Sequence, residues 1–289
     1  MMTDKAILAE NLVYRYGNLT AVDGISFEVG PGEVLGFLGP NGAGKTTTVG
    51  MLTGHLRPHE GRALLLGRDI TQHPSQVQAQ IGVCFETTNL YEQMTAVENL
   101  KLFARLFGVK NLDVDALIVR VGLDGRGKDR VAGYSKGMKQ RLMVARALVN
   151  QPKILFLDEP TEGLDPVSAE AIRALIQEEQ QRGATIFLTT HDMLEADRLS
   201  DRVAFISQGK IVALDTPQNL KLQYGKRYVR AQVKGEDARL EEREIPLDQP
   251  ETADQLQALF RNEQVMTIHS EEASLEDIFI QLTGQRLTT

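Results

Sequence analysis

Hydrophobic and polar positions follow two different periods along residues 1–225. Unbroken apolar runs at residues 34–38 (VLGFL), 154–158 (ILFLD) and 184–190 (ATIFLTT) have the length of single strands. Such continuous runs are typical of strands buried on both faces of a sheet. Because segments with a helical period and Gly-rich turns separate them, the pattern predicts an α/β domain with a largely parallel sheet.

Between about residues 86 and 135 the pattern becomes helical. The apolar residues of ENLKLFARLFGV recur at i, i+3, i+4 and i+7, namely Leu100, Phe103, Ala104 and Phe107. We therefore expect a helical subdomain, covering about residues 87–150, inserted between strands of the sheet.

From residue 226 onward the composition becomes rich in charge. YVRAQV alternates like a half-buried strand, and DQLQALFRN and SLEDIFIQLTG have the pattern of short amphipathic helices. In the last segment Ser274 is a good N-cap, Asp277 lies three residues later, and Gly284 follows the final turn. We expect a cassette domain over residues 1–225 and a small α+β appendage over 226–289. The apolar helix faces of this appendage are Leu256, Leu259 and Phe260, and Leu275, Ile278, Phe279 and Leu282.

Charge and hydropathy exclude several classes of protein. The net charge is −7, and residues 226–289 alone carry 8 basic and 13 acidic side chains, a balance of −5. Nucleic-acid binding is disfavoured because the chain has no basic stripe. No stretch reaches the roughly 18 apolar residues of a membrane span, and MMTDKAILAEN lacks the apolar core of a signal peptide. We expect a soluble, intracellular protein that reaches a membrane only through a partner.

The single cysteine, Cys84, excludes an intramolecular disulfide. It lies in the apolar run IGVCF, so we expect a buried, unreactive thiol.

The clearest chemical signal is GPNGAGKTT, which satisfies the pattern G-x-x-x-x-G-K-[ST] between a predicted strand and a predicted helix. Its backbone N–H groups and the helix N-terminus would surround phosphates. Lys45 would reach the β- and γ-phosphates, and the Thr46 hydroxyl would bind Mg²⁺. The loop comprises Gly39, Pro40, Asn41, Gly42, Ala43, Gly44, Lys45, Thr46 and Thr47.

A second signal is ILFLDEP, where a strand ends in two adjacent acids. Asp158 would join the coordination sphere of Mg²⁺, and Glu159 would polarise an attacking water. Adjacent acids at a strand end are common on their own. Together with the phosphate loop, they predict nucleotide hydrolysis.

A third signal is YSKGMKQRLMVARAL, in which Ser135 is a good N-cap and Gly137 leaves the first helical turn uncrowded. Taken alone, the segment also fits an ordinary capped helix. Its position 17 residues before ILFLDEP favours a role in the same site.

The order of phosphate loop, helical insertion, capped helix, LFLDEPTEGLDP and TIFLTTHD resembles that of the ABC transporter ATPases over residues 5 to about 220. The resemblance implies a P-loop NTPase fold of ABC type that binds ATP and Mg²⁺ and hydrolyses ATP. It also implies a head-to-tail homodimer, and a separate integral membrane permease that holds the protein on the inner face of the cell membrane.

The resemblance assigns further roles by position. Tyr16 in YRYG matches the aromatic residue that stacks on adenine. Ser135 and Gly137 match signature residues that contact the γ-phosphate bound by the opposite subunit. Asp165 in EGLDP matches an aspartate that communicates across the dimer interface. His191 matches the switch histidine that contacts the γ-phosphate and orients the water.

The chain departs from the family pattern at three places. Glu86 stands where Gln is usual; its carboxylate could still approach Mg²⁺ or the water, and its charge would alter the coupling to the membrane partner. Lys136 and Met138 change the signature from LSGGQ to YSKGM, and Glu162 stands where Ser is common. Together with the terminal SLEDIFIQLTG, these features resemble bacterial exporter ATPases for drugs, sodium, polysaccharide or haem-type cargo.

Two other functions compete with transport. Soluble ABC ATPases that act on ribosomes usually carry two cassettes, and those that act on DNA carry long coiled coils. This chain has one cassette and no sustained heptads. A non-hydrolysing regulator is disfavoured because both Glu159 and His191 are present.

Residues 87–134 are our predicted docking surface for the membrane partner. Leu90, Tyr91 and Met94 are apolar and close in sequence to Glu86, which would link docking to the nucleotide. The alternative is that these residues fill the core of the insertion itself.

Overall fold

The computed structural model describes residues 5–225, 228–234, 239–247, 249–271 and 273–285. The chain divides into two compact units between Asp215 and Thr216.

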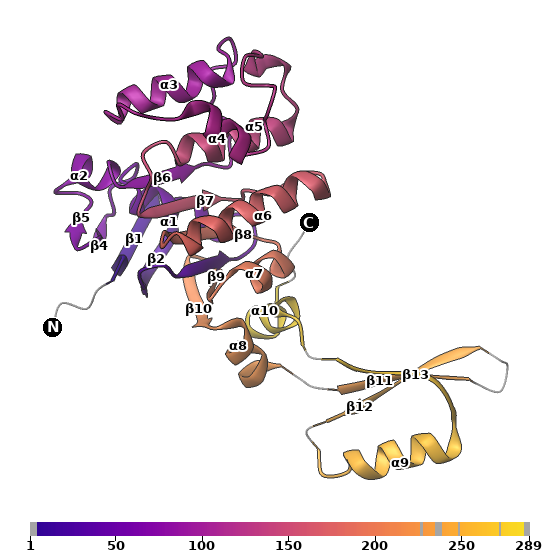
Figure 1. The fold of residues 1–289 in the computed structure, drawn as a ribbon. Helices are drawn as coiled ribbons and strands as arrows, with labels where there is room; N and C mark the ends of the chain where they lie inside the picture. Colours follow the sequence, from indigo (N-terminus) through magenta and orange to yellow (C-terminus); the bar gives the residue numbers. More distant parts are fainter. Residues whose placement is uncertain (1–4, 226–227, 235–238, 248, 272, 286–289) are drawn as a thin grey trace. The chain divides into compact units, whose positions relative to one another are not determined.

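The first unit is built on a six-stranded sheet with the order β10-β9-β3-β8-β7-β6 (Figure 1). Every neighbouring pair is parallel except β9 and β10. The three strands expected from the apolar runs are present, and all their residues are buried, which confirms the prediction of a covered, largely parallel sheet. The strands are β3 (Val34–Leu38), β6 (Ile81–Cys84), β7 (Ile154–Asp158), β8 (Thr185–Thr190), β9 (Arg202–Ser207) and β10 (Lys210–Asp215).

A second, antiparallel sheet of the first unit was not predicted. Its order is β2-β1-β4-β5, formed by β1 (Ile7–Tyr16), β2 (Leu19–Val29), β4 (Glu60–Leu65) and β5 (Arg68–Asp69). One hydrophobic core includes residues of both sheets and of α1 (Lys45–Leu52). In it the rings of Phe27, Phe37 and Phe187 lie with centroids 5.2–5.8 Å apart. This packing holds β3, and with it the loop that follows, in a fixed place.

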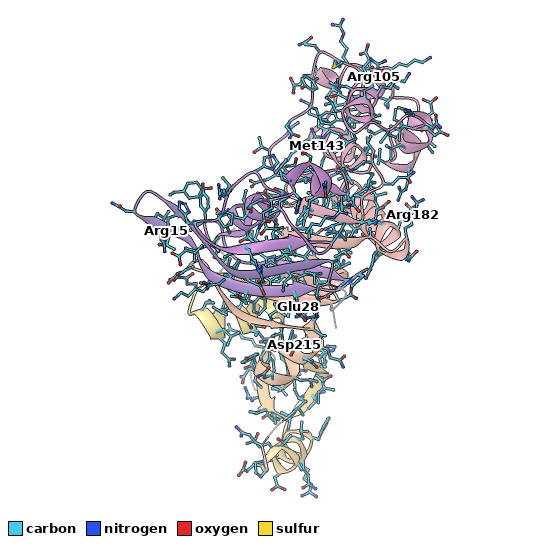
Figure 2. All side chains as sticks on the ribbon, turned by 90° about the vertical axis from the view of Figure 1, so that its left-hand side faces the viewer. Arg15, Glu28, Arg105, Met143, Arg182 and Asp215 are labelled. Carbon is cyan, nitrogen blue, oxygen red and sulfur yellow. The ribbon has the colours of Figure 1, made fainter. Side chains whose placement is uncertain are left out.

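The predicted helical subdomain is present at one end of the first unit (Figure 1). It comprises α3 (Ala96–Leu106), α4 (Val114–Arg120), the short 3₁₀ helix at Val131–Gly133, and α5 (Lys136–Ala147), and α2 (Pro74–Gln78) precedes β6. Leu100 and Ala104 are buried, but Phe103 is only half-buried and Phe107 is 40% exposed. In Figure 2, Met143 of α5 lies inside the molecule, whereas Arg105 lies at the outer end of this subdomain.

Two further helices of the first unit accompany the strands that follow the insertion. Helix α6 (Pro166–Gln181) precedes β8, and α7 (Met193–Leu199) lies between β8 and β9. Cys84 is fully buried, as expected, and burial raises the pKa of its thiol to about 12.

The described residues of the second unit form a three-stranded antiparallel sheet with the order β12-β11-β13 and three helices. The apolar face of the middle strand packs with Ile245 and Leu259. The elements are α8 (Pro217–Tyr224), β11 (Tyr228–Lys234), β12 (Leu240–Pro246), α9 (Thr252–Asn262), β13 (Gln264–Glu271) and α10 (Leu275–Thr283).

The ends of α10 confirm the sequence analysis. Ser274 and Asp277 form a reciprocal capping box, and Gly284 ends the helix with φ +68°. On α9 Leu259 is buried, whereas Phe260 is 59% exposed. Helix α8 packs against α10. For this reason the compact units meet at Asp215/Thr216, ten residues before our expected boundary.

Across the part of the chain that the structure describes, no helix is both long and apolar enough to cross a membrane.

Candidate nucleotide-binding and catalytic site

The phosphate loop joins β3 to α1, as the sequence predicts. Gly42 and Gly44 have φ +80° and +111°, values that strain any residue with a side chain. A Cβ atom at Gly44 would lie 2.6 Å from the Ala21 carbonyl oxygen, and one at Gly39 would lie 2.2 Å from that of Ile206. No described side chain caps α1 at its start. The amides of its first turn are therefore available to an anion.

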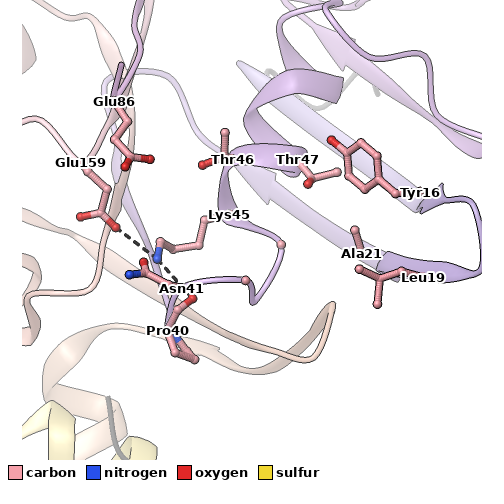
Figure 3. A pocket seen from close by; sticks show the side chains of 12 residues that line it. Tyr16, Leu19, Ala21, Pro40, Asn41, Lys45, Thr46, Thr47, Glu86 and Glu159 are labelled. Carbon is pink, nitrogen blue, oxygen red and sulfur yellow. Dashed lines mark hydrogen bonds and ion pairs between the residues drawn. The ribbon is translucent and has the colours of Figure 1, made fainter. Parts of the chain in front are cut away.

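The loop borders a cavity of about 410 Å³ (Figure 3). In Figure 3 the half-exposed ring of Tyr16 lies at one end of the cavity, and Glu86 and Glu159 lie at the other, with Lys45 between them. The cavity contains ten of the predicted site residues, and Leu19 and Ala21, which the sequence analysis missed. Its lining is Tyr16, Leu19, Ala21, Pro40, Asn41, Gly42, Gly44, Lys45, Thr46, Thr47, Glu86 and Glu159.

Lys45 and Glu159 form a buried ion pair in this cavity. Lys45 Nζ lies 3.1 Å from Glu159 Oε1 and donates to the Gly39 carbonyl oxygen at 2.7 Å. Both side chains are 6% exposed. Glu159 also has φ +48°, a conformation that costs about 1–3 kcal/mol for a residue other than glycine. Surrounding hydrogen bonds must therefore hold Glu159 in place.

His191 contacts the other oxygen of the same carboxylate. Its Nδ1 lies 3.0 Å from Glu159 Oε2, and its backbone N–H donates to that oxygen at 3.3 Å. The Glu159 N–H in turn donates to the Thr189 carbonyl oxygen at 3.1 Å. The structure thus brings together Lys45, Glu159 and His191, which lie far apart in the sequence.

Asp158 is fully buried beside this group. The Thr189 hydroxyl donates to its Oδ1, while Oδ2 has no hydrogen-bond partner in the described chain. Burial is the main cause that raises the pKa of Asp158, and Thr46 is among the hydrogen-bonding groups that oppose the shift. A buried carboxylate oxygen without a partner fits a cation ligand.

Glu86 adds a further carboxyl to this end of the cavity. Partial burial raises its pKa, as do the neighbouring charges of Glu162, Asp158 and Glu159. Within the described ranges, no group of three or more His, Cys, Asp or Glu side chains converges as a ready metal cage. Thr46, Asp158 and Glu86 offer hydroxyl and carboxyl oxygens, the kind of donor that suits Mg²⁺.

The three signature and interface candidates form a separate group. Ser135 caps α5 by accepting from the Met138 N–H at 3.2 Å, and Asp165 caps α6 by accepting from the Ser168 N–H at 3.0 Å. A Cβ atom at Gly137 would lie 2.6 Å from the Ser168 hydroxyl, so the two helix starts touch. None of Ser135, Gly137 and Asp165 is among the described residues that line the cavity of their own chain.

Several threonines that hydrogen-bond to the acidic residues of the site were not predicted from the sequence. Thr189 bonds Asp158 and the Glu159 backbone, while Thr161 and Thr190 donate to the buried Glu195. The repeated threonine of TIFLTT was a signal for such a role. Glu195, on a short helix, had none.

Known proteins resemble this chain along almost its whole length. A fluoroquinolones export ATP-binding protein of Mycobacterium tuberculosis is 45% identical over 98% of this chain and 95% of its own. The daunorubicin resistance ATP-binding protein DrrA2 of Streptomyces coeruleorubidus is 37% identical over 99% of this chain and 97% of its own. A Nod factor export ATP-binding protein I of Paraburkholderia xenovorans is 42% identical over 76% and 73% of the two chains.

The fold and the motifs agree with this likeness. The ABC transporter family model matches residues 22–162. A solved structure of an ATP-binding subunit of an ABC transporter superposes with a TM-score of 0.70 at 29% identity, covering 76% of this chain and 93% of the other. The resemblance drawn from the motifs is thereby confirmed. The chain belongs to the ABC transporter family, as one of its ATP-binding, ATP-hydrolysing subunits.

Proposed function

We propose that this protein works as a head-to-tail homodimer that powers export through a separate integral membrane permease, on the cytoplasmic face of the membrane. The observation that carries the proposal is the contact of Glu159 with both Lys45, at 3.1 Å, and His191, at 3.0 Å, beside the phosphate loop. This arrangement holds a carboxylate base, a phosphate-binding cation and an orienting imidazole at one point.

In this proposal the phosphates of ATP lie against the loop from Gly39 to Thr47, and adenine stacks on Tyr16. The phosphates compete with Glu159 for Lys45, because both are anions and Lys45 Nζ already contacts the carboxylate. When Lys45 turns to the phosphates, Glu159 becomes free to accept a proton from the attacking water. His191 remains hydrogen-bonded to that carboxylate and keeps it directed at the water.

Thr46, Asp158 and Glu86 would hold Mg²⁺, which neutralises charge on the phosphates when bound. The support within the chain is the unpartnered Asp158 Oδ2 and the raised pKa values of Asp158 and Glu86, which a cation would lower.

Ser135, Gly137 and Asp165 belong, in our proposal, to the ATP site of the other subunit. Ser135 and Asp165 are exposed, and no member of the group is among the described residues lining the cavity of its own chain. A second copy could place the start of α5, with its exposed Ser135, against the γ-phosphate.

The permease would dock in a groove of about 510 Å³ at the junction of β6 and the helical subdomain. Phe85 lines this groove while the next residue, Glu86, lines the nucleotide cavity. Tyr91 is 53% exposed there, next to Phe103 and Phe107. Leu90 packs against the core of the subdomain instead, which fits the alternative role for that residue. Aromatic and aliphatic side chains make up most of the lining, and polar groups such as Arg146 border it, so we expect an amphipathic helix of the permease as the occupant.

The direction of transport rests on the relatives. Their names refer to fluoroquinolone export, Nod factor export and daunorubicin resistance. We therefore propose export of a small organic molecule selected by the permease, in preference to a function on ribosomes or DNA.

For the second unit we propose a role in stabilising the dimer or regulating transport. A chain ending at Asp215, the observed limit of the first compact unit, should bind ATP as a monomer and lose dimerisation or transport. If that chain folds and fails to bind ATP, this division of labour is wrong.

The catalytic proposal is tested with Glu159→Gln. We expect ATP to bind but turnover to fall at least about 100-fold, and gel filtration with ATP to show a trapped dimer. Glu60→Gln is the matched control, because Glu60 is an exposed carboxylate paired with Arg15. Wild-type turnover in Glu159→Gln would remove Glu159 as the base, and a monomer in the presence of ATP would contradict the shared site.

The docking proposal is tested with Tyr91→Glu. We expect loss of co-purification with the permease and of transport, while the isolated protein keeps its ATPase activity. Leu106→Glu is the control, because Leu106 is 68% exposed in the same subdomain and is not among the described residues lining the groove. Normal assembly and transport in Tyr91→Glu would rule the groove out.

A further inference from the structure

Helix α7 carries a buried carboxyl group for which the proposed chemistry has no use. Glu195 lies four residues after His191, and its side chain is 0% exposed. A buried carboxyl is costly unless hydrogen bonds or an ion pair compensate the lost water. Burial raises the pKa of Glu195, while Thr161 and Arg173 oppose the shift.

The partners of Glu195 come from both segments that carry the catalytic candidates. Its Oε2 accepts from the Thr161 hydroxyl at 2.6 Å and lies 3.4 Å from the Thr190 hydroxyl. Thr161 follows Glu159 by two residues, and Thr190 directly precedes His191. One carboxyl group therefore ties the segment after β7 to the end of β8.

A third element fixes the carboxyl from the opposite side. Arg173 Nε of α6 forms an ion pair with Glu195 Oε1 at 3.5 Å, and neither atom has a hydrogen-bond partner among the described residues. Arg173 NH1 also pairs with Glu170 at 3.1 Å on the same helix. Glu195 therefore contacts α6 as well as the two segments that carry Thr161 and Thr190.

The catalytic candidates need such a tie for two geometric reasons. The contact of Glu159 with His191, 3.0 Å long, joins two separate segments, so its length depends on how these segments lie relative to each other. Glu159 also keeps φ +48°, which persists only where the surroundings hold the backbone.

We propose that Glu195 is a positioning residue for ATP hydrolysis, which acts through the Thr161 and Thr190 hydroxyls to keep the Glu159 carboxylate and the His191 imidazole in contact. The inference rests on the proposed function, because it takes Glu159 and His191 as the hydrolytic pair. It assigns Glu195 no contact with the nucleotide, since Glu195 is not among the described residues lining the nucleotide cavity.

The decisive variant is Thr161→Val, which removes the hydroxyl donor and preserves the shape of the side chain. We expect kcat to fall roughly tenfold or more, because small misplacements of catalytic groups have effects of this size. KM and the affinity for a non-hydrolysable ATP analogue should stay within about twofold, because the phosphate loop is untouched. Thr161→Ser, which restores the hydroxyl, should recover most of kcat.

The matched control is Thr185→Val at the start of β8, the strand that ends at Thr190. The Thr185 hydroxyl is also buried, accepts from the Gly32 N–H at 2.9 Å and donates to the Gly30 carbonyl oxygen at 3.2 Å, far along β8 from His191. It should lower the thermal midpoint without lowering kcat. Glu195→Gln, which keeps the side chain's shape and loses its charge, should lower kcat in the same direction as Thr161→Val.

The inference is overturned if folded Thr161→Val keeps the wild-type kcat, if Thr161→Ser does not recover it, or if Thr185→Val lowers kcat equally. If Glu195→Gln does not fold, the two Thr161 variants still decide. The Glu159→Gln variant distinguishes a failure of the positioning role from a failure of the proposed function. An inactive Glu159→Gln beside a fully active Thr161→Val would refute the positioning role alone, whereas an active Glu159→Gln would refute the proposed function itself.

Discussion

The two units of the protein differ in the burial of their charged side chains. In the first unit several ionisable groups are less than a tenth exposed, and most of them lie at the candidate catalytic site or one contact away. In the second unit, every buried side chain among the described residues is apolar, and the ion pairs of Arg230 and Arg243 involve side chains that are partly or largely exposed. The buried charged groups of the first unit are Lys45, Arg146, Asp158, Glu159, Glu179 and Glu195, and the arginines in the second unit's printed ion pairs are Arg230 and Arg243.

The difference shows that, in the described chain, only the first unit bears the free-energy cost of burying charged groups. An ionised group taken out of water costs several kcal/mol unless it is paired, so a cluster of such groups persists only where other contacts hold it. Exposed ion pairs are nearly neutral to stability. We therefore expect catalysis in the first unit, and we expect the second unit to act by contacts of its surface with other protein groups.

The largest expected effect is on Lys45. Lys45→Ala should reduce ATP hydrolysis at least about 100-fold, because it removes the cation of the phosphate loop and leaves Glu159 buried without its ion-pair partner. Steady-state phosphate release measures the effect, and circular dichroism checks the fold. Lys210→Ala is the control, because Lys210 is exposed and pairs with Asp23 at 3.2 Å. Retained turnover in Lys45→Ala would show that ATP hydrolysis does not depend on the buried charged groups of the first unit.

Next in size is the core of the second unit. Leu259 is 5% exposed and packs in the small core under β11. Leu259→Ala should lower the free energy of unfolding of this unit by about 2–5 kcal/mol and leave the affinity for ATP unchanged. Limited proteolysis combined with ATP titration measures both quantities. Phe260→Ala, at a position 59% exposed, should cost less than about 0.5 kcal/mol. A fall in ATP affinity in Leu259→Ala would mean that the second unit takes part in the nucleotide site.

A smaller effect is expected from the charge of Glu86. Burial and the neighbouring acids raise its pKa in the folded protein above the ordinary 4.5. Below pH 4.5 the group is protonated in both the folded and the unfolded chain. As the pH rises, the unfolded chain releases the proton first, so the folded protein loses stability until the pH passes the raised pKa.

Glu86→Gln should remove this loss. The thermal midpoint of the variant should therefore exceed that of the wild type by a small amount at pH 7, and the difference should vanish near pH 4.5. Melting curves over this pH range measure it, with Glu60→Gln as the exposed control. A variant that is less stable than the wild type at pH 7 would contradict the direction of the pKa shift.

The smallest effect is expected at Arg243, which pairs with Glu241 at 2.8 Å and Glu263 at 3.2 Å on the surface of the second unit. Arg243→Ala should leave ATP turnover unchanged and alter the thermal midpoint little, because exposed pairs are screened by water and salt. Melting curves at low and high salt measure it. A large loss of stability would show that the second unit also depends on its charges.

Local features of the chain were predictable because short-range physics decides them. The phosphate loop needs glycine at residues 42 and 44, where the backbone adopts positive φ. The strand runs, and the caps of α5 and α10, follow from apolar period and from hydroxyl or carboxyl groups placed beside free N–H groups. The family and its ATPase activity follow from the order of these local motifs.

Exposure on helix faces was less predictable, because it depends on which elements meet. Phe107 and Phe260 continue the apolar faces of their helices, yet they are 40% and 59% exposed. Helix α8 belongs to the second unit because its partner α10 lies there, about 50 residues further along the chain. The antiparallel sheet β2-β1-β4-β5 was likewise not predicted, because the pattern within a strand does not indicate which other strands pair with it.

Motifs in the sequence identified the candidate site residues, and the packing of the strands brought them into contact. Glu159 and His191 are 32 residues apart. They touch because β7 and β8 pair in parallel with Asp158 opposite Thr189, so both strands end at the same edge of the sheet. Glu195 and Thr161 meet for the same reason, since each follows one of these two strands. Strand pairing and register depend on contacts between segments that are distant in the sequence, so no local pattern in the chain specifies them.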